Sequence, residues 1–125
     1  MQETCNPDYP GIGYQCGRLM AVYAAIQTRA MGKNLGAGVI QRYYTSASTT
    51  PALVFGRLSQ LCQHHLAKLE NRGAVVYYEN LLSEISGKIG TRLPVTLDLR
   101  QQAEFSLGYY QQRAAMFTKN TDEKC

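Results

Sequence analysis

The sequence predicts an all-α fold, a compact bundle of four longer helices and one short helix that forms a single domain over residues 1–125. Apolar residues recur at spacings of three and four along several stretches, as on one face of a helix. No stretch shows the strict alternation of apolar and polar residues that is typical of a half-exposed strand. The connections are short, which favours antiparallel neighbours in a bundle.

The first helix is expected over residues 14–31. Before it, residues 1–13 are polar and contain Pro7 and Pro10, so we expect a loose lead-in that does not propagate a helix. Three glycines between positions 32 and 38 end the helix, because glycine adopts positive φ at little cost. The expected buried face consists of Leu19, Tyr23, Ile26 and Ala30.

A short second helix is expected from Val39 to about Ser46. The hydroxyl-rich run 45–50 should form a loop, because such side chains compete for backbone hydrogen bonds. Its last residue, Thr50, is a candidate cap for a third helix that begins at Pro51 and runs to about Asn71. The expected apolar face of that helix consists of Val54, Leu58, Leu61, His65, Leu66 and Leu69.

The run 71–73 should break the chain before a fourth helix, which Gly90 ends. Asp98 and Gln101 then resemble a capping box for a fifth helix over residues 99–117, followed by a flexible tail at 118–125. The expected apolar face of the fourth helix is Tyr78, Leu81, Leu82, Ile85 and Ile89, and that of the fifth is Ala103, Leu107, Tyr110, Ala114 and Phe117.

Glycines interrupt the predicted helices at Gly17, Gly56, Gly87 and Gly108. Each costs about 1 kcal/mol relative to alanine in an exposed helix interior. Their repetition therefore predicts that the helix backbone lies close to another helix or to a bound molecule. Tight packing between helices is one interpretation. Approach of a nucleic acid to the backbone beside Arg18 or Arg57 is the other.

The charge of the chain is unevenly distributed along the sequence. The net charge is only +4, but none of the nine acidic residues lies between Tyr9 and Leu69. A stretch of this kind favours polyanions, because cations that bind phosphates release counterions. A basic face that only keeps the protein in solution is the alternative. The candidate phosphate-binding residues are the six cations of this span: Arg18, Arg29, Lys33, Arg42, Arg57 and Lys68.

Aromatic residues accompany these cations at Arg42-Tyr43-Tyr44, and Arg57 follows a hydroxyl-rich segment. Donors to phosphate together with rings that stack on bases are the ingredients of sequence-tolerant binding to single strands. Ser46, Ser48 and Thr50 could add secondary hydrogen bonds, or could cap the local backbone instead.

Catalytic chemistry has no candidate residues in this sequence, so we expect no enzyme activity, no cofactor and no metal. Consecutive His64 and His65 point about 100° apart on a helix and cannot share a metal, so a packed histidine is expected. Cys62 should be a small buried residue, and all four cysteines should stay reduced in the cytoplasm. The sequence has no apolar stretch long enough to cross a membrane.

Five short motifs in the same order resemble the C-terminal helical region of the Csd1 family, the large subunit of type I-C CRISPR Cascade complexes. The resemblance extends from Tyr9 to Thr118. It departs at Gln111, where the family motif frequently has His. The motifs are Tyr14-x-x-Gly17-Arg18-Leu19, Arg42-x-Tyr44-x-x-Ala47-Ser48-x-x-Pro51, Val54-Phe55-x-x-Leu58, His65-Leu66-x-Lys68-Leu69 and Phe105-x-Leu107-Gly108-Tyr109-Tyr110.

The resemblance implies a non-catalytic small subunit, translated separately from an internal start. The implied partners are the large subunit, the backbone subunits, further copies of itself, and the guide RNA and target DNA, chiefly the displaced non-target strand. In such complexes base pairing reads the sequence, so protein need supply only charge and shape. Two other functions stay open: a structural adaptor that bridges the subunits without contacting nucleic acid, and a helix-turn-helix regulator.

Overall fold

The computed structural model describes residues 9, 11–31 and 39–124 and confirms the all-α fold. In this part of the chain it has five helices and no strand. Lys33 and most of the lead-in lie outside the described residues. The helices are α1 (Ile12–Met31), α2 (Val39–Thr49), α3 (Pro51–Lys68), α4 (Arg72–Ile89) and α5 (Leu99–Lys124).

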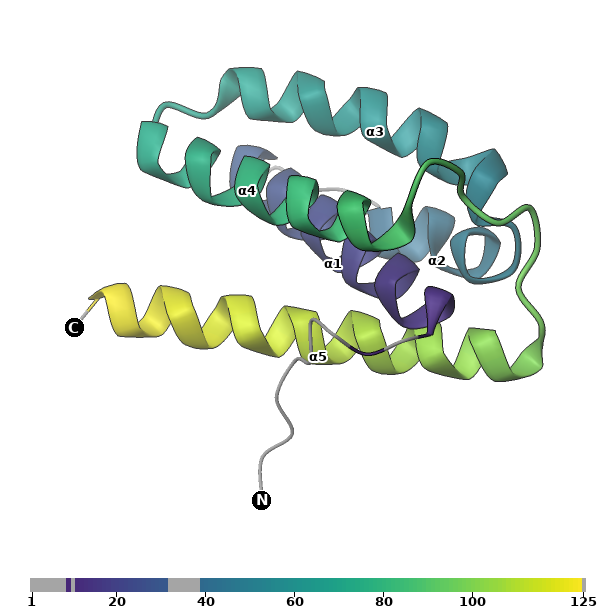
Figure 1. Cartoon of the computed structure of the whole chain (residues 1–125). Helices are drawn as coiled ribbons and strands as arrows, with labels where there is room; N and C mark the ends of the chain where they lie inside the picture. The colour runs from purple at the N-terminus through teal and green to yellow at the C-terminus, as the bar shows by residue number, and fades with distance from the viewer. Residues whose placement is uncertain (1–8, 10, 32–38, 125) are drawn as a thin grey trace.

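Helix α1 is the centre of the bundle. Every residue from Gly13 to Ala24 is buried, so α1 has no solvent-exposed face over more than three turns. The other four helices each pack against it. Figure 1 shows α3 and α5 on opposite sides of α1, with α5 running in the same direction as α1. The outward faces of α3 and α5 therefore lie on opposite sides of the molecule.

The predicted core faces of α1, α3 and α4 are confirmed in their central residues. Aromatic rings contribute edge-to-face contacts, with Tyr23 and Phe55 at 5.8 Å between ring centroids and Tyr44 and Phe105 at 5.3 Å. Burial also raises the pKa of the Cys16 and Cys62 thiols to about 12, which keeps them protonated. The predicted core residues found buried are Leu19, Tyr23, Ile26, Leu58, His65, Leu66, Tyr78 and Ile85.

The hydroxyl-rich segment is helical to Thr49, so the predicted loop at 45–50 is wrong. Its hydroxyls donate to backbone carbonyls one turn earlier, as Ser48 Oγ does to the Thr45 oxygen at 2.8 Å. Burial of Ala47 anchors this last turn. The Thr50 hydroxyl likewise donates back to the Ser46 oxygen at 3.0 Å, so Thr50 does not cap α3 with its side chain.

The other helix ends follow the local sequence more closely. Asn71 caps α4 by accepting a hydrogen bond from the Ala74 amide at 3.1 Å, so α4 starts directly at Arg72 and Gly73 lies inside it. The predicted capping box of α5 is confirmed: the Asp98 amide donates to Gln101 at 2.9 Å, and the Gln101 amide donates to Asp98 at 2.8 Å. Helix α5 continues to Lys124, past the predicted end at Phe117 and into the predicted tail.

The predicted buried face of α5 is wrong. Ala103, Leu107 and Tyr110 are exposed and Ala114 is half-buried, while the side chain of Phe117 lies outside the described residues. The side of α5 that meets α1 instead carries Phe105, Gly108, Tyr109, Gln112 and Met116. The physical reason is that α5 packs on α1 through a glycine and a hydrogen-bonded glutamine, residue types that a hydrophobic pattern does not identify as buried.

The four helix-interior glycines divide into two classes. Cβ atoms added at Gly17 and Gly108 would clash with the backbone carbonyls of Phe105 and Tyr14, so these glycines allow close packing of α1 against α5, the first of the two interpretations. Gly13, which the sequence analysis missed, packs on the Gln101 carbonyl in the same way. A Cβ atom added at Gly56 or Gly87 would meet no atom of another element within 4 Å, so the packing interpretation is wrong for these two glycines.

His65 is a buried histidine, as predicted, and its Nδ1 has no hydrogen-bond partner among the described residues. Burial lowers the pKa of His65, and His64 and Lys68 lower it further. A lowered folded-state pKa means that the unfolded chain binds the proton more readily. The stability that neutral His65 provides is therefore complete above the pKa of His65 in the unfolded chain, near 6.5. It is lost as the pH falls through the lower pKa that His65 has in the folded protein.

We expect the free energy of unfolding to decrease as the pH falls below about 6.5, with part of the slope coming from His65. Urea titrations between pH 5 and 8 test this. His65→Leu removes the titrating group, so the curve should flatten, whereas His64→Gln removes only a secondary cause of the lowered pKa and should flatten it less. An equally steep curve for His65→Leu would show that other groups cause the acid sensitivity.

Candidate nucleic-acid interface

Arg18 is buried at the junction of α1, α4 and α5, with 2% of the residue exposed. Its Nε donates to Gln112 Oε1 at 2.9 Å, one amino group donates to Gln15 Oε1 at 2.8 Å, and the other lies 3.4 Å from Glu84 Oε1. A buried guanidinium needs such partners, because leaving water without them is costly. Arg18 is therefore a structural residue in this fold and not part of the exposed basic surface, which corrects its assignment as a phosphate ligand.

Four of the predicted phosphate-binding cations are solvent-exposed: Arg29 near the end of α1, Arg42 in α2, and Arg57 and Lys68 in α3. Among the described residues, none of the four forms an ion pair with a carboxylate. Their charges are therefore not neutralised by protein contacts in this part of the chain. Arg57 and Lys68 share one helix, whereas Arg29 and Arg42 come from two others.

The exposed face of α3 forms a polar and basic strip, which we call the α3 strip. Its members recur at spacings of three and four, and the buried residues Phe55, Leu58 and Cys62 occupy the opposite face. From Arg57 to Lys68 the strip rises by about 16 Å, at 1.5 Å per residue, a length that several phosphates can occupy. Helix α3 itself contains no Asp or Glu. The α3 strip consists of Arg57, Gln60, His64 and Lys68.

Arg57 also connects α3 to α2, because its Nε donates to the Tyr43 hydroxyl at 3.2 Å. This contact places Tyr43, and with it the N-terminal half of α2, beside the basic strip. Tyr44 has a different role: its hydroxyl shares a hydrogen bond with Ser106 at 2.8 Å and its ring packs on Phe105 and Tyr109. Of the two predicted stacking tyrosines, Tyr44 is therefore half-buried against the core, and Tyr43 accompanies the strip.

Sequence reasoning missed two members of the α3 strip. His64 was grouped with its buried neighbour and Gln60 was not considered, although both follow Arg57 at helical spacings of seven and three. The spacing itself could have identified them. Ser48 and Thr50, by contrast, donate to backbone carbonyls, so local bonding is their role in this structure.

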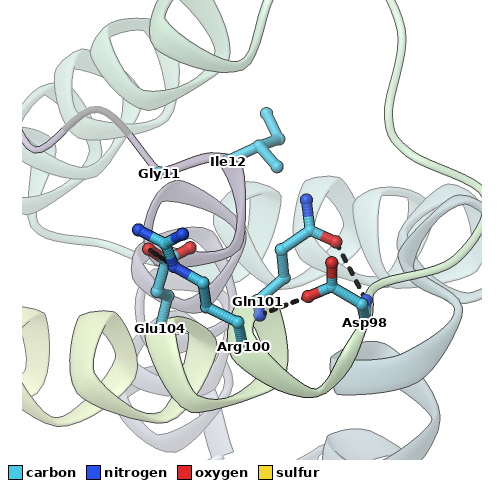
Figure 2. Close-up of a pocket in the computed structure, with 6 residues that line it drawn as sticks. All are labelled: Gly11, Ile12, Asp98, Arg100, Gln101 and Glu104. Carbon is cyan, nitrogen blue, oxygen red and sulfur yellow. Dashed lines mark hydrogen bonds and ion pairs between the residues drawn. The ribbon is translucent and has the colours of Figure 1, made fainter.

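A pocket of about 440 Å³ opens where the N-terminal ends of α1 and α5 meet (Figure 2). Its polar groups already have partners: Asp98 and Gln101 cap each other, and Glu104 accepts from the Tyr9 hydroxyl at 3.4 Å and lies 3.9 Å from Arg100. The pocket is part of the helix-capping arrangement and presents no unpaired carboxylate with catalytic geometry. It is lined by Gly11, Ile12, Asp98, Arg100, Gln101 and Glu104.

The part of the chain that the structure describes contains no cluster of three side chains able to hold a metal ion. Cys16 and Cys62 are free thiols. None of the helices searched there is both long and apolar enough to cross a bilayer.

Fold and surface together define a small helical protein built around a buried central helix, with an exposed basic strip on one side. The family model of CRISPR-associated protein (Cas_Csd1) matches residues 1–117. The chain therefore belongs to the Csd1 family of CRISPR-associated proteins, as the sequence motifs indicated. No curated protein matches it. Membership of this family makes CRISPR effector proteins its general class of partner.

Proposed function

We propose that this chain is the non-catalytic small subunit of a type I-C CRISPR surveillance complex in the cytoplasm. It binds the nucleic-acid backbone, chiefly the displaced non-target DNA strand, and so stabilises the opened target. The observation that supports this proposal is the α3 strip, an exposed basic helix face without a carboxylate of its own.

The chemistry of the strip suits a backbone better than a base sequence. Arg57 and Lys68 attract phosphates by charge, and Gln60 and His64 can donate hydrogen bonds between them. Tyr43 supplies one ring beside Arg57 for sequence-tolerant stacking. Sequence recognition is left to the guide RNA, which pairs with the target strand.

The proposal is tested in complexes assembled with and without this chain. Omitting it should weaken binding of target DNA without removing a nuclease activity. Adding back the wild-type chain should restore binding, whereas Arg42→Ala, Arg57→Ala and Lys68→Ala combined should restore it poorly and about equally for unrelated targets.

The matched control replaces three exposed cations outside the acid-free span, Arg72, Lys88 and Arg92, by alanine. Both sets remove three positive charges, so a difference in target DNA binding between them reflects the position of the charges and not the net charge. Equal loss of binding for both sets would contradict a dedicated interface on α2 and α3. The structural-adaptor function would then be favoured.

A further inference from the structure

Helix α5 carries a second surface that the proposed function does not use. On the side opposite the residues that meet α1, exposed apolar residues recur at spacings of four, four and three. Leu99 is 83% exposed and Tyr110 is 58% exposed. We call this surface the α5 stripe; it consists of Leu99, Ala103, Leu107 and Tyr110.

Exposed apolar side chains scattered singly need no explanation, but a continuous stripe on one helix face is typical of a docking surface. The spacing is the pattern by which one amphipathic helix contacts another. Among the described residues, no other helix packs on this side of α5. The stripe is also distant from the α3 strip, since α1 lies between the two helices.

The charges beside the stripe indicate the chemistry of its partner. Arg100 and Arg113 are exposed next to it, and Arg100, although 3.9 Å from Glu104, keeps a side chain that is 88% exposed. Glu104 is the only acid between Leu99 and Met116, and its side chain is turned toward the bundle with 14% exposed. Asp98 precedes the helix and caps it. The stripe is therefore apolar with positive flanks.

A second copy of the chain is a poor partner for this surface. In a parallel pair Arg100 would face Arg100, and in an antiparallel pair Arg100 would approach Arg113. Like charges placed together in an interface oppose association. Helix α4, which carries Glu79 and Glu84, presents Val76 as its only large exposed apolar side chain among the described residues, so it offers no complementary stripe.

We propose that the α5 stripe docks an amphipathic helix of another protein subunit, with apolar residues at spacings of three and four and with Asp or Glu beside them. The carboxylates would pair with Arg100 and Arg113, while the apolar faces bury each other. This inference needs the chain to act within an assembly, but it does not depend on the α3 strip binding nucleic acid.

Photo-crosslinking in the fully assembled complex tests the proposal. A benzophenone amino acid replaces Tyr110, and mass spectrometry identifies the crosslinked segment. We expect a helical segment of another subunit that carries acidic residues beside its apolar face. The same probe at Val76 of α4, also exposed, should not label that segment. Crosslinks from position 110 to nucleic acid, to another copy or to residues 1–8 of the same chain would overturn the proposal. The absence of any crosslink from position 110 would overturn it as well.

A charge exchange separates true docking from proximity. Arg100→Glu with Arg113→Glu should lower incorporation of the chain into the complex about tenfold, because two attractive contacts become repulsive. Replacing the acidic residues of the crosslinked segment by Lys should restore it. The free chain should bind DNA as well as an Arg72→Glu, Arg92→Glu variant of equal net charge, so this failure is distinguishable from failure of the nucleic-acid proposal. Unchanged incorporation of the double Glu variant would overturn the docking surface.

Discussion

Replacing Gly17 by alanine should destabilise the protein by about 3 kcal/mol, although alanine is the better helix former. A Cβ atom at this position would clash with the Phe105 carbonyl and the Tyr109 amide nitrogen. These are backbone atoms of α5, so the two helices must separate to admit the methyl group. Because α1 and α5 form the most extensive helix contact, that separation should affect the whole bundle. Urea denaturation of the wild-type and variant chains measures the effect.

The same substitution at Gly56 and Gly87 provides the matched control. Nothing lies within 4 Å of a Cβ atom at either position, so alanine there should stabilise the chain by up to about 1 kcal/mol. Gly108→Ala should resemble Gly17→Ala, because it meets the Tyr14 carbonyl across the same interface. Equal effects at Gly17 and Gly87 would contradict the close packing of α1 on α5.

Replacing Arg18 by alanine should be the second large loss, on the order of 3 kcal/mol in the free energy of unfolding. The guanidinium is the common donor to Gln15, Gln112 and Glu84. Removing it deprives the buried side-chain amides of Gln15 and Gln112 of the hydrogen bond that Arg18 donates to each. Buried polar groups that lose a partner are costly. The melting temperature should fall by roughly 10 °C for a chain of this size.

Glu84→Gln should cost less than Arg18→Ala, because the Glu84 side chain is 40% exposed and water can replace its contact. Measured under conditions where the variant remains folded, Arg18→Ala should leave DNA affinity unchanged. This result would separate Arg18 from Arg42 and Arg57. A stable Arg18→Ala variant with weakened DNA binding would show that the buried position is not maintained in solution.

The sequence predicted the fold class because α1, α3 and α4 bury apolar residues at helical spacing, and because Asp98 and Gln101 match a specific capping motif. It failed on α5, whose outward face is as apolar as its inward face. The inward face includes Gly108 and Gln112, which pack through shape and hydrogen bonding. Hydrophobic periodicity carries no information on packing through shape or on packing through hydrogen bonds.

The candidate site was predicted in part for a similar reason. The acid-free span correctly drew attention to Arg57 and Lys68, which share the exposed face of α3. It could not reveal that Arg18 is buried, because burial depends on Gln112 and Glu84, which lie 94 and 66 residues away in the sequence. A count of charges does not distinguish a surface cation from one that holds three helices together.

The salt dependence of DNA binding by the free chain tests the central claim most directly. Affinity for an unstructured single strand is measured at several salt concentrations, and log affinity is plotted against log salt. Each phosphate contact removed should flatten the slope by about 0.7, so the combined Arg42, Arg57 and Lys68 alanine variant should lose about 2 if all three bind phosphate. The Arg72, Lys88 and Arg92 variant should keep the wild-type slope. Equal slopes for the two variants would contradict a nucleic-acid interface on α2 and α3.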